Sequence, residues 1–204
     1  MKEKAKSLLV LDHHKTAQVD LAGLPFCRFD MHKSGARLTW EYFFPGYPAP
    51  WLVAYTEDRD LWTHRLPGTK EINAVIRSYP LSFETWDRLD KLDPEDLIPE
   101  GSAILRYRQQ LIDAAVSQAG EIEMDGYKVL AVNCSCGEIV SEVAGELAKD
   151  RRFGVTWFET AKGQRVYSLR SRENAVDVSE IAKRHGGGGH RNAAGFQVPN
   201  EQPK

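Results

Sequence analysis

The sequence predicts an α/β protein of two domains joined by a helix. Short apolar runs alternate with capped helical stretches in both halves of the chain, which is the pattern of α/β folds. Two X-Pro steps, at residues 93–94 and 98–99, punctuate the middle, and a long apolar stripe at helical spacing follows from Ser102. We expect a first domain with a parallel sheet, a connector helix, and a smaller second domain with a mixed sheet. Their predicted bounds are residues 1–98, 99–120 and 121–204.

Composition narrows the function classes. The 204 residues are 42% hydrophobic and 27% charged, as in ordinary globular proteins. A net charge of −2 argues against a broad surface that coats nucleic acid, so a polyanion would be met locally. The sequence has no 18-residue apolar run and no signal-peptide pattern, which predicts a cytoplasmic protein without a membrane partner. The three cysteines are too few for a disulfide framework, and buried small hydrophobes are the favoured interpretation of Cys134 and Cys136.

The first half predicts one strand and then several helices. Residues 7–11 are apolar on both parities, which is typical of a central strand in a parallel sheet covered on both faces. Ser34 can cap a helix that runs to about Phe44. Further helices, the last two with Thr or Ser caps, are predicted over residues 50–55, 69–78 and 82–92.

The second half predicts a mixed sheet with helices. Asp125-Gly126 is a strong two-residue hairpin signal between two strand-like runs. Ser135 and Glu138 have the spacing of a capping box for a helix that ends near Lys149. The remaining elements are a helix over 102–119, strands over 121–124, 127–132, 153–159 and 165–172, and a helix from about 178 to 185 capped by Asp177.

A polar triplet, Asp12-His13-His14, begins where the first predicted strand ends. Ligand sites in open α/β sheets lie at the carboxyl ends of strands. Two imidazoles and a carboxylate at such a place form a plausible metal corner, although a capped turn is the alternative.

Three acids, Glu57, Asp58 and Asp60, fall within four positions of the first half. Bringing them together is costly unless cations share them, and Arg59 could balance one. Both a metal site and a surface turn with an Arg–Asp network are consistent with this pattern.

The third conspicuous stretch is the glycine run at residues 186–189, flanked by His185, His190 and Arg191. Glycines let a ligand approach the main-chain amides, and the flanking side chains are donors suited to phosphate oxygens. A flexible linker or a long helix C-cap is the alternative. In the preceding strand Ser168, Arg170 and Arg172 share one face, which is a candidate substrate wall because Arg grips phosphate in a bidentate manner.

This ending, with residues 167–172 and 176–182 before it and Ala193-Ala194-Gly195-Phe196 after it, resembles the C-terminal domain of the DHH phosphoesterase family. Asp12-His13-His14 matches the triplet that names the family, so the resemblance covers nearly the whole chain. It implies hydrolysis of phosphodiester bonds in a cleft between two domains. The implied cofactor is a pair of Mn²⁺ ions, with Mg²⁺ as a second candidate. The implied substrate is a short single-stranded oligonucleotide or a nucleotide.

The resemblance also implies a role for each matched residue. His13 would be a metal ligand, Asp12 a ligand or its orienter, and His14 would face the substrate phosphate. Asp58 would be the remaining metal-binding and catalytic residue, with Asp60 as the second candidate. The implied substrate-binding residues are Arg170, Gly187, Gly188, Gly189, His190 and Arg191.

One departure from the family affects these expectations. Family members carry an aspartate-rich motif and a further aspartate upstream of the triplet, whereas Glu3 is the single acid before Asp12. The chain therefore resembles a member that lacks its N-terminal motifs, and we expect an incomplete active site and little hydrolysis by this chain alone.

Two other functions stay open at this stage. One is a non-catalytic module that binds single-stranded nucleic acid or phosphate, and the other is the role of the similar domain of alanyl-tRNA synthetases. The sequence does not distinguish oligoribonucleotide, cyclic dinucleotide, single-stranded DNA and polyphosphate, and it leaves a homodimer open.

Overall fold

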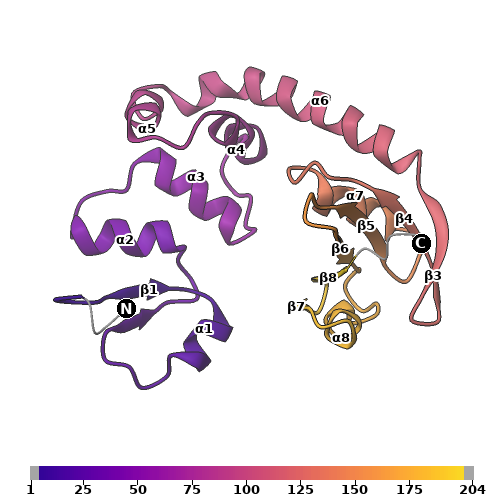
Figure 1. Cartoon of the computed structure of the whole chain (residues 1–204). Helices are drawn as coiled ribbons and strands as arrows, with labels where there is room; N and C mark the ends of the chain where they lie inside the picture. The colour runs from indigo at the N-terminus through magenta and orange to yellow at the C-terminus, as the bar shows by residue number, and fades with distance from the viewer. Residues whose placement is uncertain (1–4, 200–204) are drawn as a thin grey trace. The chain divides into compact units, whose positions relative to one another are not determined.

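The computed structural model describes residues 5–199, with the backbone alone at residues 15 and 16. The chain forms two compact units, Met1–Leu105 and Arg106–Lys204, here called unit 1 and unit 2. Helix α6 (Ile98–Val116) begins in unit 1 and ends in unit 2 (Figure 1). The predicted α/β fold is confirmed, with a parallel sheet in unit 1 and a mixed sheet in unit 2. None of the helices within residues 5–199 is both long enough and apolar enough to cross a membrane.

Unit 1 begins with a small β-α-β arrangement. Strands β1 (Val10–Asp12) and β2 (Cys27–Phe29) are parallel, and helix α1 (Lys15–Asp20) connects them. The sequence predicted a central strand with both faces covered. Instead, β2 is the one strand that pairs with β1 among the described residues, and no residue of either strand is buried. The apolar run therefore lies in an open two-stranded sheet.

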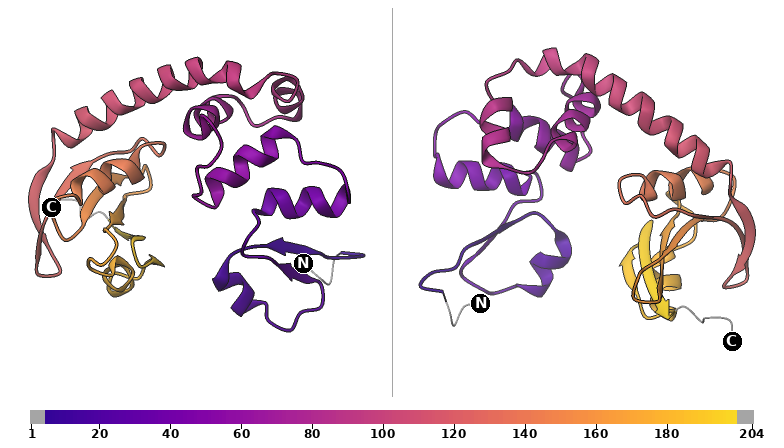
Figure 2. Two further views of the ribbon diagram at one scale, coloured as in Figure 1. Left: turned by 180° about the vertical axis from the view of Figure 1, so that it is seen from behind. Right: turned by 45° about the horizontal axis from the view of Figure 1, so that its top comes forward.

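Helices make up the rest of unit 1, and neighbouring helices in the chain pack together (Figure 2). They are α2 (Gly35–Phe43), α3 (Trp51–Asp60), α4 (Thr69–Ser78), α5 (Phe83–Leu89) and the 3₁₀ helix η2 (Pro94–Leu97). Two predicted caps form, because Ser34 Oγ accepts from Arg37 N at 3.1 Å and Ser82 Oγ accepts from Thr85 N at 3.1 Å. The core of this unit is made by Tyr55, Ile72, Val75 and Leu97.

Two details of these helices differ from the prediction. Helix α3 continues to Asp60, so the acid-rich stretch lies on a helix and not in a turn. The N-cap of α4 is Gly68, with φ +65°, and not Thr69. The Thr69 hydroxyl donates to the Asp58 carboxylate instead.

Unit 2 is built on one mixed sheet of six strands in the order β3-β4-β5-β6-β8-β7. The β4–β5 pair is parallel and the other pairs are antiparallel. Asp125 (φ +51°) and Gly126 (φ +81°) make the predicted hairpin turn. The strands are β3 (Gly120–Met124), β4 (Tyr127–Asn133), β5 (Gly154–Glu159), β6 (Gln164–Arg170), β7 (Gly188–His190) and β8 (Ala193–Pro199).

Helices cover both faces of this sheet. Helix α8 (Val178–Arg184) packs on the face that carries Val155, Leu169 and Phe196. Helix α7 (Val140–Leu147) and the end of α6 pack on the opposite face, against Val132. Asp177 caps α8 as predicted, since its Oδ1 accepts from Ser179 N at 3.0 Å. The predicted capping box at Ser135 does not form, because α7 begins later, with Ile139 as its N-cap.

Candidate functional site

The triplet lies at the carboxyl end of β1, between that strand and α1. Asp12 is the last residue of the strand and His14 is the N-cap of the helix. Asp12 Oδ1 accepts from His13 N at 2.7 Å and lies 2.7 Å from His14 Nδ1. The carboxylate therefore contacts the backbone of His13 and the imidazole of His14, and the two rings have centroids 4.5 Å apart.

This group has the chemistry of a metal corner. Asp12, His13 and His14 each offer one ligand atom, and the three atoms lie within 4.8 Å of one another. Carboxylate oxygen and imidazole nitrogen together suit first-row transition metals such as manganese. The hydrogen bond with His14 lowers the pKa of Asp12, although partial burial acts in the other direction. An ionised Asp12 beside two imidazoles fits one divalent cation.

Asp60 is the acid that the structure brings to this corner. Its Oδ2 lies 3.2 Å from His13 Nε2, and 46% of its side chain is exposed. Asp60 is the last residue of α3, so the contact joins that helix to the end of β1. The sequence named it only as the second candidate after Asp58.

Asp58 has a different role. The residue is 6% exposed, and its two carboxylate oxygens already accept four hydrogen bonds. The donors are Thr63 Oγ1, Arg65 N, Leu66 N and Thr69 Oγ1. Burial alone would raise the pKa of Asp58, but these donors outweigh it and hold the pKa well below its ordinary value.

These hydrogen bonds give Asp58 a structural role, and its predicted metal-binding role stays a prediction. Side chains two positions apart on an α-helix are rotated by about 200° around the helix axis, so they point to nearly opposite sides. Because α3 extends through this stretch, Asp58 turns into the unit while Asp60 turns to the corner. Glu57, the third acid, accepts from Arg37 Nε at 2.8 Å and Ser34 N at 3.2 Å, and so ties α2 to α3.

The structure brings one more acidic residue, Asp30, to the end of the sheet at which the triplet lies, and the sequence did not predict it as part of the site. Asp30 follows β2 directly, and its backbone N–H donates to the carbonyl of Asp12 at 3.2 Å. The available signal was an acid after the strand-forming run Cys27–Phe29. That signal was missed because the run is only three residues long.

In unit 2, the strand register aligns two of the predicted substrate-binding residues. Arg170 on β6 lies opposite Ala193 on β8, and Ala193 lies opposite His190 on β7. Residues opposite one another point to the same side of a sheet, so Arg170 and His190 flank the small Ala193 across roughly 10 Å. The next position on this face consists of Ser168, Gly195 and Gly188. We call this low surface, bordered by Arg170 and His190, the small-residue face.

The glycine run builds the edge of the sheet. A Cβ on Gly187 would lie 2.2 Å from the carbonyl oxygen of Gly195, and one on Gly189 would lie 2.6 Å from that of Ala193. Gly186 has φ +77°, which strains any other residue. A Cβ on Gly186 or on Gly188 would have no atom within 4 Å, but of these two only Gly188 has a backbone conformation that other residues readily adopt. Gly188 and Gly189 lie in the strand β7, and close backbone packing explains Gly187 and Gly189, while the predicted contact of Gly187, Gly188 and Gly189 with phosphate stays a prediction.

The two arginines of the prediction have different environments. Arg191 donates to the carbonyl of Ala175 at 3.1 Å and lies 3.6 Å from Asp177 Oδ2, so it secures the segment before α8. Arg170 donates to Ser141 Oγ at 2.7 Å, and desolvation lowers its pKa. Arg170, and not Arg191, belongs to the small-residue face.

His185 has a structural partner. Its Nε2 lies 2.8 Å from Asp125 Oδ2, while Arg184 Nε donates to Asp125 Oδ1 at 2.8 Å. Its ring stacks on Phe196 with centroids 4.4 Å apart, and Phe196 in turn stacks on Tyr167 at 4.7 Å. His185 therefore joins the end of α8 to the hairpin of β3 and β4.

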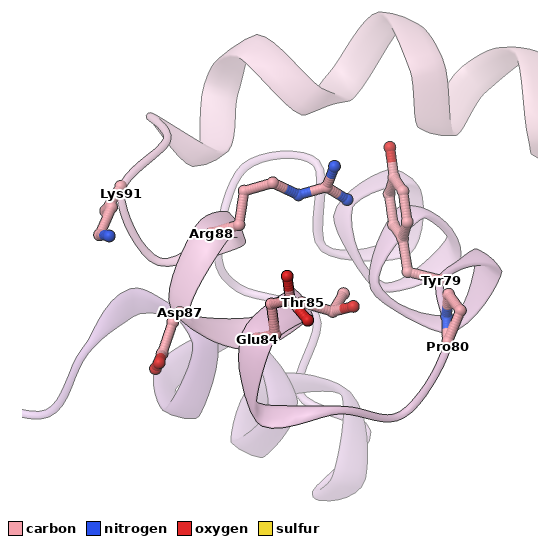
Figure 3. A pocket seen from close by; sticks show the side chains of 7 residues that line it. All are labelled: Tyr79, Pro80, Glu84, Thr85, Asp87, Arg88 and Lys91. Atoms are coloured by element: carbon pink, nitrogen blue, oxygen red, sulfur yellow. The ribbon is translucent and has the colours of Figure 1, made fainter.

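Two cavities lie elsewhere in unit 1, and none of the predicted site residues lines them. In the larger, of about 780 Å³, Arg88 extends over the ring of Tyr79, with 4.9 Å between guanidinium carbon and ring centroid (Figure 3). It is lined by Tyr79, Pro80, Glu84, Thr85, Asp87, Arg88 and Lys91. The smaller, of about 430 Å³, is an apolar groove along Trp40, Val53 and Trp86.

Comparison with known proteins finds a matching domain family and a related viral protein. The model of the DHHA1 domain matches residues 126–204, most of unit 2. An uncharacterized protein, R106 of Acanthamoeba polyphaga mimivirus, is 34% identical over 204 residues. The match covers 94% of this chain and 48% of R106, so the chain spans about half the length of this curated relative.

One solved structure shares the fold at low identity, and a second is similar at a lower TM-score. A pGpG-specific phosphodiesterase, PggH from Vibrio cholerae, has a TM-score of 0.53 at 15% identity, over 95% of this chain and 74% of that one. An exopolyphosphatase-related protein from Bacteroides fragilis has a TM-score of 0.48 at 16% identity, over 95% of this chain and 58% of that one. Residues 126–204 match the DHHA1 domain, and together with the Asp12-His13-His14 triplet this match is consistent with a member of the DHH phosphoesterase family.

Proposed function

We propose that the protein is a metal-dependent phosphoesterase that hydrolyses phosphodiester bonds in short oligonucleotides or small nucleotides. The observation that carries the proposal is the contact between His13 and Asp60. It adds a second carboxylate to the triplet, in a chain whose residues 126–204 match the DHHA1 domain. A surface turn would need neither the converging ligand atoms nor an acid from a separate helix.

Within this corner, Asp12, His13 and Asp60 would hold the cation, for which Mn²⁺ is the first candidate and Mg²⁺ the second. A divalent cation supplies charge stabilisation at a phosphoryl oxygen and a nucleophilic water at neutral pH. Asp12 orients His14 through their 2.7 Å contact, and the His14 side chain is 62% exposed. His14 is thus available to a substrate phosphate, in agreement with the role that the sequence implied.

The small-residue face of unit 2 would bind a phosphate group. Arg170 and His190 offer donors on either side of a surface without bulk, so a phosphate can approach the sheet closely. Because the net charge of the chain is −2, attraction of a polyanion would be local and would weaken with added salt.

Asp60→Asn tests the proposed function, with Asp87→Asn as a matched control on the exposed side of α5. Manganese binding is measured by calorimetry, and hydrolysis of the dinucleotide pApA is followed by chromatography. We expect Asp60→Asn to weaken Mn²⁺ binding at least tenfold and to slow hydrolysis about 100-fold, because a direct charged ligand is lost. Asp87→Asn should change neither quantity.

Three outcomes are informative. Unchanged metal binding and rate in Asp60→Asn would refute the proposed corner. Hydrolysis of tripolyphosphate in preference to pApA would move the substrate class to phosphoanhydrides. Binding of pApA that does not change on addition of Mn²⁺ would favour a nucleic-acid-binding module over an enzyme.

A further inference from the structure

Trp62 is an exposed aromatic residue two positions after Asp60, the acid that contacts His13. Trp62 is 83% exposed, the highest value among the large apolar residues that the structure describes. An isolated exposed apolar side chain needs no special explanation. The position and backbone conformation of this one set it apart.

The backbone at Trp62 is held in an unfavourable conformation. Trp62 has φ +56° and His64 has φ +46°, and for bulky side chains the left-handed region is a true outlier. Such conformations persist when the surrounding structure enforces them, and they are concentrated at ligand-binding and active sites.

The enforcing structure is the segment organised by Asp58. Trp62 N donates to the carbonyl of Arg59 at 3.0 Å, and Thr63 N donates to that of Asp58 at 3.0 Å. The Asp58 carboxylate then binds the backbone N–H groups of Arg65 and Leu66. The ring of Trp62 meets that of His64 edge to face, with centroids 5.8 Å apart. The indole is thus presented to solvent by a well-tied segment.

The same segment connects Trp62 to the corner through Asp60. Asp60, whose carboxylate contacts His13, stands two positions before Trp62. Two residues span at most about 7 Å between Cα atoms, so the indole begins within one nucleotide length of the corner. Asp58 anchors both sides of the turn, because its carbonyl accepts from Thr63 N and its carboxylate accepts from Arg65 N and Leu66 N.

We propose that Trp62 is a stacking platform for the nucleobase next to the bond that is cleaved. This inference rests on the proposed function and narrows its substrate class to nucleotides, since polyphosphate has no base. Base–aromatic stacking tolerates any sequence because every base has a flat π face. Trp62 would contribute to binding of the base, while Asp12, His13 and Asp60 would act at the phosphate.

The test measures binding of two fluorescently labelled probes that carry the same phosphates, pApA and its abasic analogue, with Mn²⁺ replaced by Ca²⁺ to limit turnover. The variants are Trp62→Ala, Trp62→Phe and the control Phe83→Ala. Phe83 is 82% exposed in the same unit and lies on α5, away from the triplet in the chain. We expect Trp62→Ala to weaken pApA binding about tenfold and to leave the abasic analogue unchanged. The affinity of Trp62→Phe for pApA should stay within about threefold of that of the unmodified protein. The affinity of Phe83→Ala should equal that of the unmodified protein.

Each other outcome is decisive. Equal binding of the two probes by the unmodified protein, or an equal loss for both in Trp62→Ala, would overturn the stacking role. Base-dependent binding through Trp62 without hydrolysis in Mn²⁺ would refute the proposed function and still support stacking. Hydrolysis of pApA with an unaltered KM in Trp62→Ala would refute stacking and leave the proposed function standing.

Discussion

The acid-rich end of α3 and the glycine run before β8 each contain two kinds of residue. In the first region Asp58 is buried under four donors, whereas Asp60 is half exposed and reaches His13. In the second, Gly187 is fitted against β8, whereas a Cβ on Gly188 would meet open space. In both regions the residues that give the sequence its signature include some that only shape the backbone. A family motif therefore marks a place in the fold more reliably than it marks each ligand.

The largest expected effect separates the two acids. Asp58→Asn should lower the free energy of unfolding by about 3 kcal/mol, because an amide cannot accept from all four donors of the carboxylate. Asp60→Asn should cost less than about 1 kcal/mol, the range for exposed ion pairs. Urea unfolding at pH 7 measures both values.

The pH dependence of Asp58→Asn provides a control. The pKa of Asp58 is lowered on folding, so its stabilisation is complete above the pKa of the unfolded chain, about 4. It declines as pH falls toward the lowered folded value. The gap between the original protein and Asp58→Asn should narrow below about pH 4. Equal losses for the two substitutions at pH 7 would break the comparison.

The second prediction divides the glycines. Gly187→Ala should lower stability by about 2 kcal/mol, because the new methyl group collides with the backbone of β8. Gly188→Ala should change stability by less than about 1 kcal/mol, since a residue with a side chain fits an open strand position. Thermal unfolding of the two variants is the measurement. If Gly188→Ala were the less stable variant, the packing explanation of the run would be wrong.

Local signals in the sequence predicted the fold of unit 2 well. The dipeptide Asp125-Gly126 fits only a few types of turn. Asp177 is placed to accept from the backbone N–H of Ser179 at the start of α8. Alternation of apolar and polar residues identifies the strands β5 and β6. The predicted capping box does not form because α7 begins only after Ile139, four residues beyond Ser135. Ile139 is packed in the core, and we infer that this packing decides where the helix begins. Residue type was enough where one local interaction dominated.

The site of unit 1 was only partly predictable. Asp12-His13-His14 was recognised because the three residues are consecutive in the sequence, and the contacts within the triplet are local. The choice between Asp58 and Asp60 depended on how far α3 extends, and a shift of two residues turns a side chain to the other side of a helix. The contact of Asp60 with His13 spans 47 positions of the chain, and no local pattern encodes it.

The third prediction compares Arg170 with Arg191. Arg170→Ala should weaken binding of a short oligonucleotide about tenfold, or about 1.4 kcal/mol, because Arg170 borders the small-residue face. Arg191→Ala should change binding less than threefold, because Arg191 is engaged with Ala175 and Asp177. Titration at two salt concentrations should show a smaller salt slope in Arg170→Ala only. The reverse ranking would assign phosphate binding to the segment before α8.

The smallest expected effect concerns Asp125, which makes an ionic contact that holds the end of α8. Asn tolerates a left-handed backbone as Asp does, so Asp125→Asn at φ +51° removes the charge without disturbing the turn. Burial would raise the pKa of Asp125, but His185 and Arg184 outweigh it and lower the pKa. We expect a loss of about 0.5–1 kcal/mol at pH 7, measured by urea unfolding.

The pH dependence has the same sign as for Asp58, with a smaller amplitude. The contribution of Asp125 is present above the unfolded pKa of about 4 and disappears as pH falls through the lowered folded value. High salt should also reduce it, because Arg184 is 53% exposed and His185 is 37% exposed. Salt should leave the Asp58 effect nearly unchanged, since that carboxylate is 6% exposed and its donors carry no net charge. A salt-insensitive loss in Asp125→Asn would mean that geometry, and not charge, joins α8 to the β3–β4 hairpin.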